Sequence, residues 1–332
     1  MRTQVITWGI VFAGSPAFKK NFNLNSVSGS AIQLIGNTSL LELTRLSSNL
    51  NGKVHAKAEF QNPSGSIKDR MVHYALNMAE SRCEIKPGDT IVEASSGNTG
   101  VALSMMAAVK GYQAVIVIPD TTSRVKIKMM KAYGAEVIVT SASEGVNAAV
   151  LEAKSQTEKR GAFLLNQFKN LDNVKAHHRT GHEILVQAGK VDAFVAGVGT
   201  GGTLIGVAEA LKQADSSTRI IAVEPLTAPA FYNMYYGEDL PIGDGIPHSI
   251  EGIGETFVPE ILQNNIGIVD GVILVSDENA FKTRDRLAVE EGLFAGISSG
   301  ANVWASMQVA SELEPDDCVV TVLPDTGQRY LD

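Results

Sequence analysis

From Ile32 onward, short apolar runs alternate with longer segments in which apolar residues recur at helical spacing. The short runs, rich in β-branched residues and bounded by turn formers, predict strands, and the longer segments predict helices. The predicted strands are 54–60, 90–94, 114–119, 136–140, 193–197, 219–223 and 319–323, and the predicted helices are 66–82, 99–110, 123–133, 145–159, 203–212, 278–291 and 301–313. This alternation indicates an α/β fold with mostly parallel, helix-covered sheets.

Several predicted helices end at glycine, including Gly111 and Gly134, as a left-handed C-cap requires. The chain contains no internal repeat, low-complexity tract or long linker. Two domains, if present, must therefore be interleaved rather than consecutive.

Length, charge and cysteine content limit the kinds of protein that this chain can be. A length of 332 residues with 44% hydrophobic residues is enough for one large or two ordinary globular domains. The net charge of -8 and the lack of a basic tract argue against a nucleic-acid partner. Cys83 and Cys318 form no disulfide framework and no metal-ligand spacing, so we interpret both as structural residues in a reducing, intracellular protein.

The N-terminal residues 1–30 precede the alternating pattern. No apolar run in the chain approaches the ~20 residues of a membrane-spanning helix. Residues 1–14 combine one positive charge with a short apolar stretch, which also occurs in organelle-targeting signals. We interpret residues 1–30 as a loosely attached extension of a cytoplasmic protein, with organelle targeting as the alternative.

Three glycine-rich turns each follow a strand and open a helix: NPSGSIKDR (62–70), SSGNTG (95–100) and GVGTGGT (197–203). Such turns present free backbone N–H groups at the positive end of a helix dipole, so each can bind an anion. In a parallel sheet they gather at the carboxyl edge of the strands, where ligands bind. The sequence therefore predicts a ligand site at this edge.

The third turn allows three interpretations. Gly197, Gly199 and Gly202 satisfy G-x-G-x-x-G, and Glu224 ends the next strand, as in an NAD site. The turn also suits a single phosphate monoester, with Thr200 and Thr203 as hydroxyl donors. A structural turn that needs glycine for its backbone angles is the third interpretation.

Lys68 lies in the first of these turns. Gly65 lets the chain turn sharply and Ser66 can cap the helix, which places Lys68 in the first helical turn at the strand edge. The helix dipole and burial should both lower the pKa of the Lys68 ammonium, which favours a nucleophilic, Schiff-base lysine. A solvated surface lysine is the alternative.

The three turns together favour one cofactor. A Schiff-base lysine, a phosphate cradle and a second anion-binding turn for a substrate carboxylate describe a pyridoxal phosphate enzyme that acts on an amino acid. An NAD enzyme would leave the first two turns without a function.

The same motifs resemble a known family. NPSGSIKDR, SSGNTG, GVGTGGTL, GISSG (296–300) and PDTGQRYL (324–331) are similar, in this order, to motifs of the cysteine synthase (O-acetylserine sulfhydrylase) family of fold-type II pyridoxal phosphate enzymes. The resemblance runs from about residue 32 to residue 332. It implies a tryptophan synthase β-like fold with a smaller mobile domain over 62–170 and a larger cofactor-binding domain over 31–61 and 171–332.

The resemblance also implies roles for individual residues. Lys68 would carry pyridoxal 5′-phosphate as an aldimine and remove the substrate α-proton, Asn98 would bond the phenolic oxygen of the cofactor, and Ser298 would meet its pyridine nitrogen. The remaining implied contacts are Gly199, Thr200, Gly201, Gly202 and Thr203 to the phosphate, and Ser95, Ser96, Asn98, Thr99 and Gln167 to the substrate carboxylate.

The implied reaction is β-replacement on O-acetyl-L-serine with sulfide, which gives L-cysteine by way of an α-aminoacrylate. The family is typically homodimeric, and some members bind a serine acetyltransferase. Three alternatives stay open within the superfamily: cystathionine β-synthase, an O-phosphoserine-dependent sulfhydrylase, which the absence of Lys and Arg from 220–281 disfavours, and a serine or threonine dehydratase. A non-catalytic binding paralogue and an NAD-binding protein are the alternatives from another class.

Some positions depart from the family pattern. Ser95 replaces threonine, Ser39 replaces proline and Gln328 replaces glutamate, without removing a catalytic group. In PHSIEGIG (247–254), Ser249 and Glu251 differ from the common lysine and glutamine, which leaves the choice of donor open.

A histidine cluster offers a different chemistry. His177, His178 and His182, with Glu183 beside them, could suggest a metal site. Their spacing fits no common zinc pattern, so we predict no metal and place these residues on a solvated helix.

Overall fold

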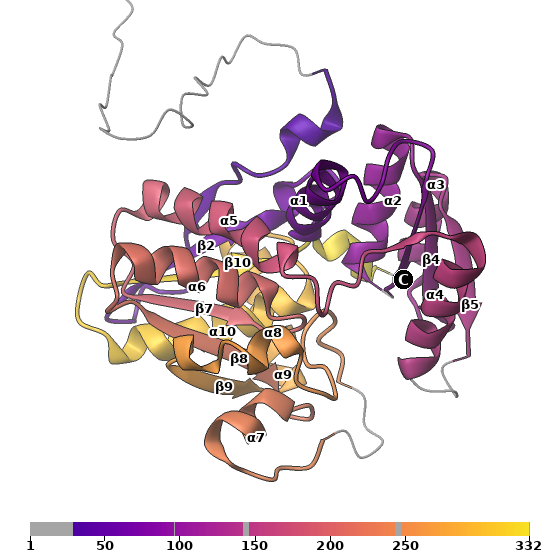
Figure 1. Ribbon diagram of the computed structural model, residues 1–332. Helices are drawn as coiled ribbons and strands as arrows, with labels where there is room; N and C mark the ends of the chain where they lie inside the picture. The colour runs from indigo at the N-terminus through magenta and orange to yellow at the C-terminus, as the bar shows by residue number, and fades with distance from the viewer. Residues whose placement is uncertain (1–28, 96, 142–145, 243–247, 332) are drawn as a thin grey trace, which may run out of the picture.

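The computed structural model describes residues 29–95, 97–141, 146–242 and 248–331. Within these ranges the chain forms two sheets flanked by helices, which lie side by side in Figure 1. The strands are β1 Leu40–Glu42, β2 Lys53–Ala58, β3 Thr90–Ala94, β4 Gln113–Pro119, β5 Glu136–Thr140, β6 Phe163–Leu164, β7 Ala193–Gly197, β8 Arg219–Pro225, β9 Gly271–Val275 and β10 Cys318–Leu323. The helices are α1 Lys68–Ser81, α2 Asn98–Lys110, α3 Arg124–Ala132, α4 Val146–Arg160, α5 Asp172–Ala188, α6 Gly202–Ala214, α7 Ala230–Tyr236, α8 Glu260–Gln263, α9 Asp277–Glu291 and α10 Ile297–Glu312, with short 3₁₀ segments that include Glu59–Gln61 and Gly327–Tyr330.

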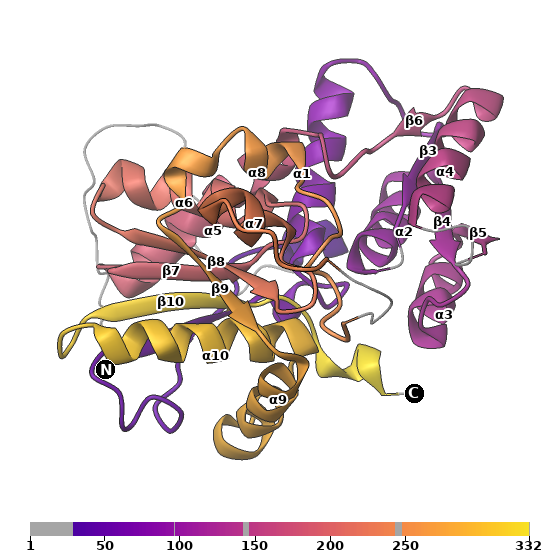
Figure 2. The ribbon, with the colours of Figure 1, turned by 90° about the horizontal axis from the view of Figure 1, so that it is seen from below.

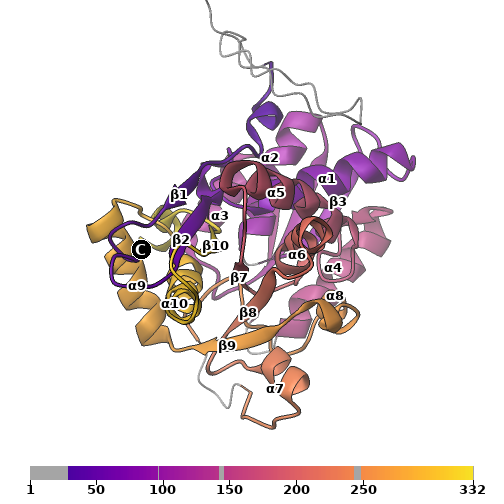
Figure 3. The same ribbon diagram turned by 90° about the vertical axis from the view of Figure 1, so that its left-hand side faces the viewer.

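The larger sheet has the strand order β1-β2-β10-β7-β8-β9. All of its pairs are parallel except β1 with β2. Helices α5 and α6 cover one face and α9 and α10 cover the other, as the end-on view in Figure 3 shows. The carboxyl ends of β7, β8 and β10 therefore meet at one edge, because parallel strands share a direction.

The smaller sheet has the order β5-β4-β3-β6, and all of its pairs are parallel. Apolar residues from α2 and α3 pack on one face and residues from α4 pack on the other. Figure 2 shows this lobe beside the larger one, with α1 between them. Its strands fall within the predicted range 62–170, whereas the division into two domains and the mobility of the smaller one stay predictions.

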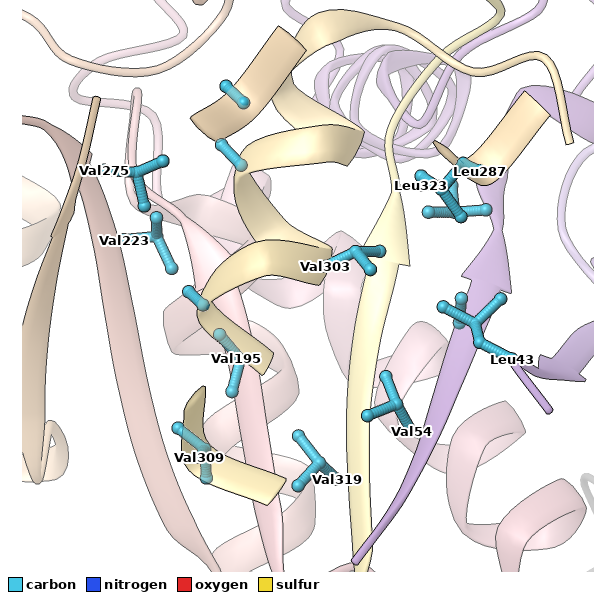
Figure 4. Packing of buried hydrophobic residues seen from close by; sticks show 14 of the residues in the cluster. Leu43, Val54, Val195, Val223, Val275, Leu287, Val303, Val309, Val319 and Leu323 are labelled. Atoms are coloured by element: carbon cyan, nitrogen blue, oxygen red, sulfur yellow. The ribbon is translucent and has the colours of Figure 1, made fainter. Parts of the chain in front are cut away.

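Alternate residues of the central strands point to opposite faces of the sheet and belong to two different hydrophobic cores. On β10, Val319 and Leu323 join the cluster under α10, and Val320 and Val322 join the cluster under α5 and α6. Figure 4 shows Val303 of α10 packed over the strands with its apolar neighbours. Burial on both faces explains why these strands are continuously apolar in sequence.

All seven predicted strands form, with small differences at their ends. The run predicted as 54–60 leaves the sheet after Ala58 and continues as a 3₁₀ turn over Glu59–Gln61. The reason is the fully buried carboxylate of Glu59, which bonds Thr38 Oγ1 at 2.7 Å and Arg70 Nε at 2.7 Å. These partners are distant in the sequence, so a local pattern does not reveal them.

The helices predicted at 66–82 and 301–313 begin elsewhere. Ile67 occupies the N-cap of α1, and the Ser66 hydroxyl accepts the N–H of Lys68 at 3.3 Å. Helix α10 already begins at Ile297, because GISSG forms its first buried turn instead of a loop. The pattern gave no bounds for the strands β1, β6 and β9 or for the helices α7 and α8, whereas the histidine segment that it placed on a helix is part of α5. Residue 145, the predicted start of α4, lies outside the described residues.

Two further findings concern the chain as a whole. Most of the predicted extension, residues 1–28, lies outside the described residues. None of the helices in the described ranges has the combination of length and hydrophobicity that a bilayer-spanning helix requires.

Candidate active site

A pocket of about 400 Å³ lies between the two lobes. A smaller cavity of about 40 Å³ adjoins it and shares Lys68, Asn98 and Thr200 with it. Together the two cavities are lined by most of the predicted site residues: Lys68, Ser95, Asn98, Thr99, Gln167, Gly199, Thr200, Gly201, Thr203 and Ser298. Gly202 lies behind this wall as the first residue of α6, and Ser96 is outside the described residues.

Lys68 is the first residue of α1 and lines both cavities. Burial lowers the pKa of its ammonium, and the negative charges of Glu255 and Asp325 partly oppose this shift. A lowered pKa leaves more of the amine unprotonated and nucleophilic. Lys68 thus lies on the wall of both cavities and is not a solvated helix lysine.

A buried network from the C-terminal segment holds the loops around Lys68. Arg329 donates to the Ser64 carbonyl and to Asn98 Oδ1, and Asn98 Nδ2 donates to Asp325 Oδ2 at 2.7 Å. Tyr330 Oη donates to the same carboxylate oxygen at 2.6 Å. The network fixes the Asn98 amide with its nitrogen toward Asp325 and its oxygen toward Arg329.

No role for Asp325 or Arg329 was predicted from the motifs. Both are completely or almost completely buried. The motif PDTGQRYL places this acidic and this basic residue directly after a buried apolar strand. Buried charges require partners, so the pair could have been recognised in the sequence as part of a buried network.

The glycine turn at 199–203 is a tight cradle at the start of α6. Gly201 has a φ of +84°, which favours glycine. A Cβ at Gly199 would lie 2.5 Å from the Gly252 carbonyl oxygen, and one at Gly202 would lie 2.1 Å from Asn173 Oδ1. The turn therefore requires glycine at these positions, and its N–H groups form the anion-binding end of a helix.

Two hydroxyls of the turn are positioned by α5. Asn173 Nδ2 donates to Thr200 Oγ1 at 2.9 Å, and His177 Nε2 lies 3.2 Å from Thr203 Oγ1. His177 is completely buried, and burial lowers its pKa well below the usual value. The prediction that this histidine lies on a solvated helix face was wrong, because that face of α5 packs against α6.

The other two histidines of the cluster also have protein partners. His178 Nε2 contacts a carboxylate oxygen of Glu209, and His182 Nδ1 lies 2.7 Å from the His178 carbonyl oxygen. In the part of the chain that the structure describes, no group of three His, Cys, Asp or Glu side chains is placed to bind a metal.

The loop at 95–100, the second predicted anion-binding turn, also lines the large pocket. Thr99 Oγ1 donates to Gln167 Oε1 at 2.7 Å, and both side chains are buried. Ser95 Oγ accepts the N–H of Gly100 at 3.2 Å at the start of α2. Glu93 of β3 accepts the N–H of Asn166 at 2.7 Å, which holds the turn that carries Gln167.

Ser298 supplies a buried hydroxyl to the smaller cavity from the first turn of α10. Asn302, one turn later, bonds the N–H of Gly197 at 2.8 Å and the Val322 carbonyl at 2.9 Å. These bonds tie α10 to the ends of β7 and β10. Asn302 was not predicted as a site residue, since its partners are far away in the sequence.

Glu224 does not behave as the acidic residue of an NAD site. Its buried carboxylate accepts the N–H of Phe231 at 3.0 Å and the N–H of Tyr232 at 2.7 Å. Burial raises the pKa of Glu224 to about 7. Because this carboxylate already binds two N–H groups at the start of α7, it is not free to bind the ribose of a dinucleotide. The NAD interpretation of the glycine turn therefore lacks its acidic residue.

These residues fit pyridoxal phosphate. An amine of lowered pKa, a glycine cradle at a helix start, and a buried hydroxyl lie on the walls of two joined cavities. The cofactor needs a Schiff-base lysine, a phosphate site and a partner for its ring nitrogen, and the cavities offer one of each.

Comparisons with known proteins agree with this fit. The family model described as "Pyridoxal-phosphate dependent enzyme" matches residues 31–325. A cysteine synthase of Staphylococcus aureus is 44% identical over 302 residues, which cover 90% of this chain and 94% of that protein.

Solved structures of pyridoxal-phosphate dependent enzymes also resemble this chain. The cysteine synthase of Entamoeba histolytica has a TM-score of 0.85 at 34% identity and covers 98% of this chain and 93% of its own. An O-acetylserine-dependent cystathionine β-synthase of Helicobacter pylori has a TM-score of 0.84 at 34% identity, with 92% and 98% covered. The predicted α/β fold, family and cofactor are confirmed: the chain belongs to the family of pyridoxal-phosphate dependent enzymes.

Proposed function

We propose that the protein catalyses β-replacement on O-acetyl-L-serine with sulfide and so forms L-cysteine. The observation that carries this proposal is the position of Lys68, on the wall of a pocket between a glycine cradle and the Ser95–Thr99 loop. The similarity to cysteine synthases over nine-tenths of the chain supports the choice of reaction.

The residues of the two cavities would hold the cofactor as follows. Lys68 Nζ would bind it covalently, and the N–H groups and hydroxyls of Gly199, Thr200, Gly201, Gly202 and Thr203 would bind its phosphate. Ser298 would bond its ring nitrogen and Asn98 would bond its phenolic oxygen. When bound, pyridoxal phosphate supplies an electron sink that stabilises negative charge at the α-carbon of an amino acid.

The chain itself supplies orientation and proton transfer. The loop with Ser95, Ser96, Asn98 and Thr99, completed by Gln167, orients the substrate carboxylate. Lys68 then accepts the α-proton at Nζ, and its lowered pKa leaves the amine free to do so. Ser298 is a neutral partner that does not keep the ring nitrogen protonated as a carboxylate would, which favours loss of the β-substituent over transamination.

We further propose that the smaller domain, residues 62–170, closes over the substrate. Lys68 at the start of α1 and the Thr99–Gln167 pair lie on one wall of the pocket, and Gly199 and Thr200 of the glycine turn lie on the other. Closure would exclude water from the reacting carbon. By resemblance to its family, we propose a cytoplasmic homodimer that can bind a serine acetyltransferase.

The pocket favours O-acetylserine over O-phosphoserine as donor. A phosphate at the β-position requires a cation that is not already neutralised. Lys126 lies in the pocket wall, and its ammonium is paired with the Glu251 carboxylate. Arg124, the alternative cation, is exposed at the start of α3.

The proposed function is tested by offering O-acetylserine, O-phosphoserine and serine separately, each with sulfide and with homocysteine. We expect the highest turnover with O-acetylserine and sulfide, with cysteine identified as the product. Faster turnover with O-phosphoserine, or with serine and homocysteine, would show that an alternative donor or reaction is the correct one.

The glycine cradle gives a second measurable expectation. In Gly199→Ala the new methyl group meets the Gly252 carbonyl, so the turn and the loop at 252 must separate. We expect the dissociation constant of pyridoxal phosphate to rise at least about tenfold, equivalent to ~1.4 kcal/mol. Fluorescence titration of cofactor into the stripped protein measures this.

Gly267→Ala is the matched control, because a Cβ at Gly267 meets nothing within 4 Å. Its cofactor affinity should equal that of the parent. Unchanged affinity in Gly199→Ala as well would place the phosphate elsewhere.

A further inference from the structure

The loop at 248–255 brings two glutamates, Glu251 and Glu255, to the wall of the large pocket. The loop is anchored by the N–H of Gly254, which donates to the Val198 carbonyl at 2.9 Å, and by Ile250, which is completely buried. The Gly252 carbonyl lies against the cradle at Gly199. Both glutamates therefore belong to a firmly held loop beside the proposed cofactor site.

The two glutamates differ in their partners. Glu251 forms an ion pair with Lys126, a buried residue of the smaller lobe. The ammonium of Lys126 therefore neutralises the charge of the Glu251 carboxylate. For Glu255 no hydrogen bond or ion pair occurs within the described residues. The charged groups that act on its carboxylate are His248 of the same loop and Lys68 of α1.

Glu255 has the properties of a base. Burial raises the pKa of its carboxyl group, and the positive charges of His248 and Lys68 partly oppose this shift. A carboxylate of raised pKa without a fixed partner is able to take up a proton from a ligand in the pocket. In the proposed reaction with sulfide, Lys68 accepts the α-proton. Glu255 is therefore an additional base that this reaction does not use.

The nature of the nucleophile decides whether this base is needed. Sulfide is available as the hydrosulfide anion, which needs no base and is repelled by a carboxylate. An amino-acid thiol, with a pKa of about 8.5, arrives mostly protonated at neutral pH and therefore needs a base to become a nucleophile. A thiol amino acid therefore suits this wall of the pocket better than hydrosulfide.

We propose that Glu255 is a further catalytic residue that accepts the thiol proton of an amino-acid nucleophile, so that the protein also forms thioether amino acids. This inference rests on the proposed function, because it uses the same O-acetylserine half-reaction, in which acetate leaves with the electron pair of the Cβ–O bond. The S–H bond then breaks toward Glu255, sulfur bonds to Cβ with its electron pair, and Lys68 returns a proton to Cα. Glu255 later releases its proton to water.

The experiment separates the two half-reactions in the holoenzyme. O-acetylserine is added first, and the change in cofactor absorbance is recorded by stopped flow. L-homocysteine or sulfide is added next, and the return of the absorbance is followed, with the product identified by mass spectrometry. The variants are Glu255→Gln, Glu255→Asp and the control Glu238→Gln, which removes an exposed glutamate outside the pocket.

We expect Glu255→Gln to slow the homocysteine phase by at least about 100-fold, in the range of general-base effects, and to leave the O-acetylserine and sulfide phases within about threefold of the parent. Glu255→Asp should recover part of the homocysteine rate, and Glu238→Gln should match the parent.

Equal slowing of the sulfide and homocysteine phases in Glu255→Gln would overturn the inference, because it would show a structural role. A parent enzyme that reacts with sulfide and not with homocysteine would overturn it as well, while leaving the proposed function intact. If O-acetylserine caused no absorbance change in the parent, the proposed function would fail and the inference with it.

Discussion

Lys68→Ala is expected to lose β-replacement activity by at least about 10³-fold and to lose the yellow colour of covalently bound cofactor. The variant lacks both the amine that attaches the cofactor and the base that accepts the α-proton. Lys68 as a whole residue is only partly buried, so the fold should tolerate the removal of its side chain. Turnover with O-acetylserine and sulfide and the visible absorption spectrum of the purified protein measure the two effects.

Lys128→Ala is the matched control, since it removes an exposed lysine of α3 that lies away from the pocket. It should keep both colour and activity. If Lys68→Ala retained the visible absorbance, another amine would carry the cofactor. If it retained activity, the mechanism proposed for this pocket would be wrong.

Arg70→Met is expected to destabilise the protein by about 3–5 kcal/mol, the usual cost of an unpaired buried charge. Arg70 is buried on α1 two residues after Lys68 and binds Glu59 through Nε and Nη2 at 2.7 and 2.8 Å. It also binds Glu183 of α5 at 2.9 and 2.7 Å. Without the guanidinium, the fully buried Glu59 keeps only neutral partners and Glu183 keeps Lys57.

Urea unfolding followed by circular dichroism measures the loss. Arg286→Met is the matched control, because Arg286 forms a partly exposed pair with Glu290 within one helix, and such pairs contribute about 0–1 kcal/mol. The double variant Glu59→Gln/Arg70→Met should recover part of the lost stability, since it removes both charges. A loss below about 1 kcal/mol for Arg70→Met would mean that water reaches Glu59 after the substitution.

The same ion pairs explain how α1 is held in the correct place. Arg70 joins the end of β2, helix α1 and helix α5, and Lys68 lies half a turn before it. Burial raises the pKa of Glu183, yet the hydrogen bonds and charge of Arg70 outweigh this and bring it to about 2. The carboxylate thus stays charged at any pH at which the protein is expected to work, and the position of Lys68 does not depend on its titration.

Local sequence determined the parts of the site that depend on short-range geometry. A strand followed by a glycine turn and a helix is specified within about ten residues, so the sequence correctly placed Lys68, the 95–100 loop and the 197–203 cradle at the edge of parallel strands. Alternating apolar residues likewise predicted the central strands, because both sheet faces are buried. The GISSG motif lines the predicted site through Ser298, but its position within a helix was missed, and the role of Ser298 stays a prediction.

Only the tertiary structure revealed which distant residues complete the pocket. The Asn98–Arg329 contact joins residues 231 positions apart, and Arg70 meets Glu183 across 113 positions. The pairing of Lys126 with Glu251, which leaves Glu255 without a partner among the described residues, spans 125. Such contacts follow from how two sheets pack together, and the local pattern of apolar and polar residues carries no information about which buried charges will meet.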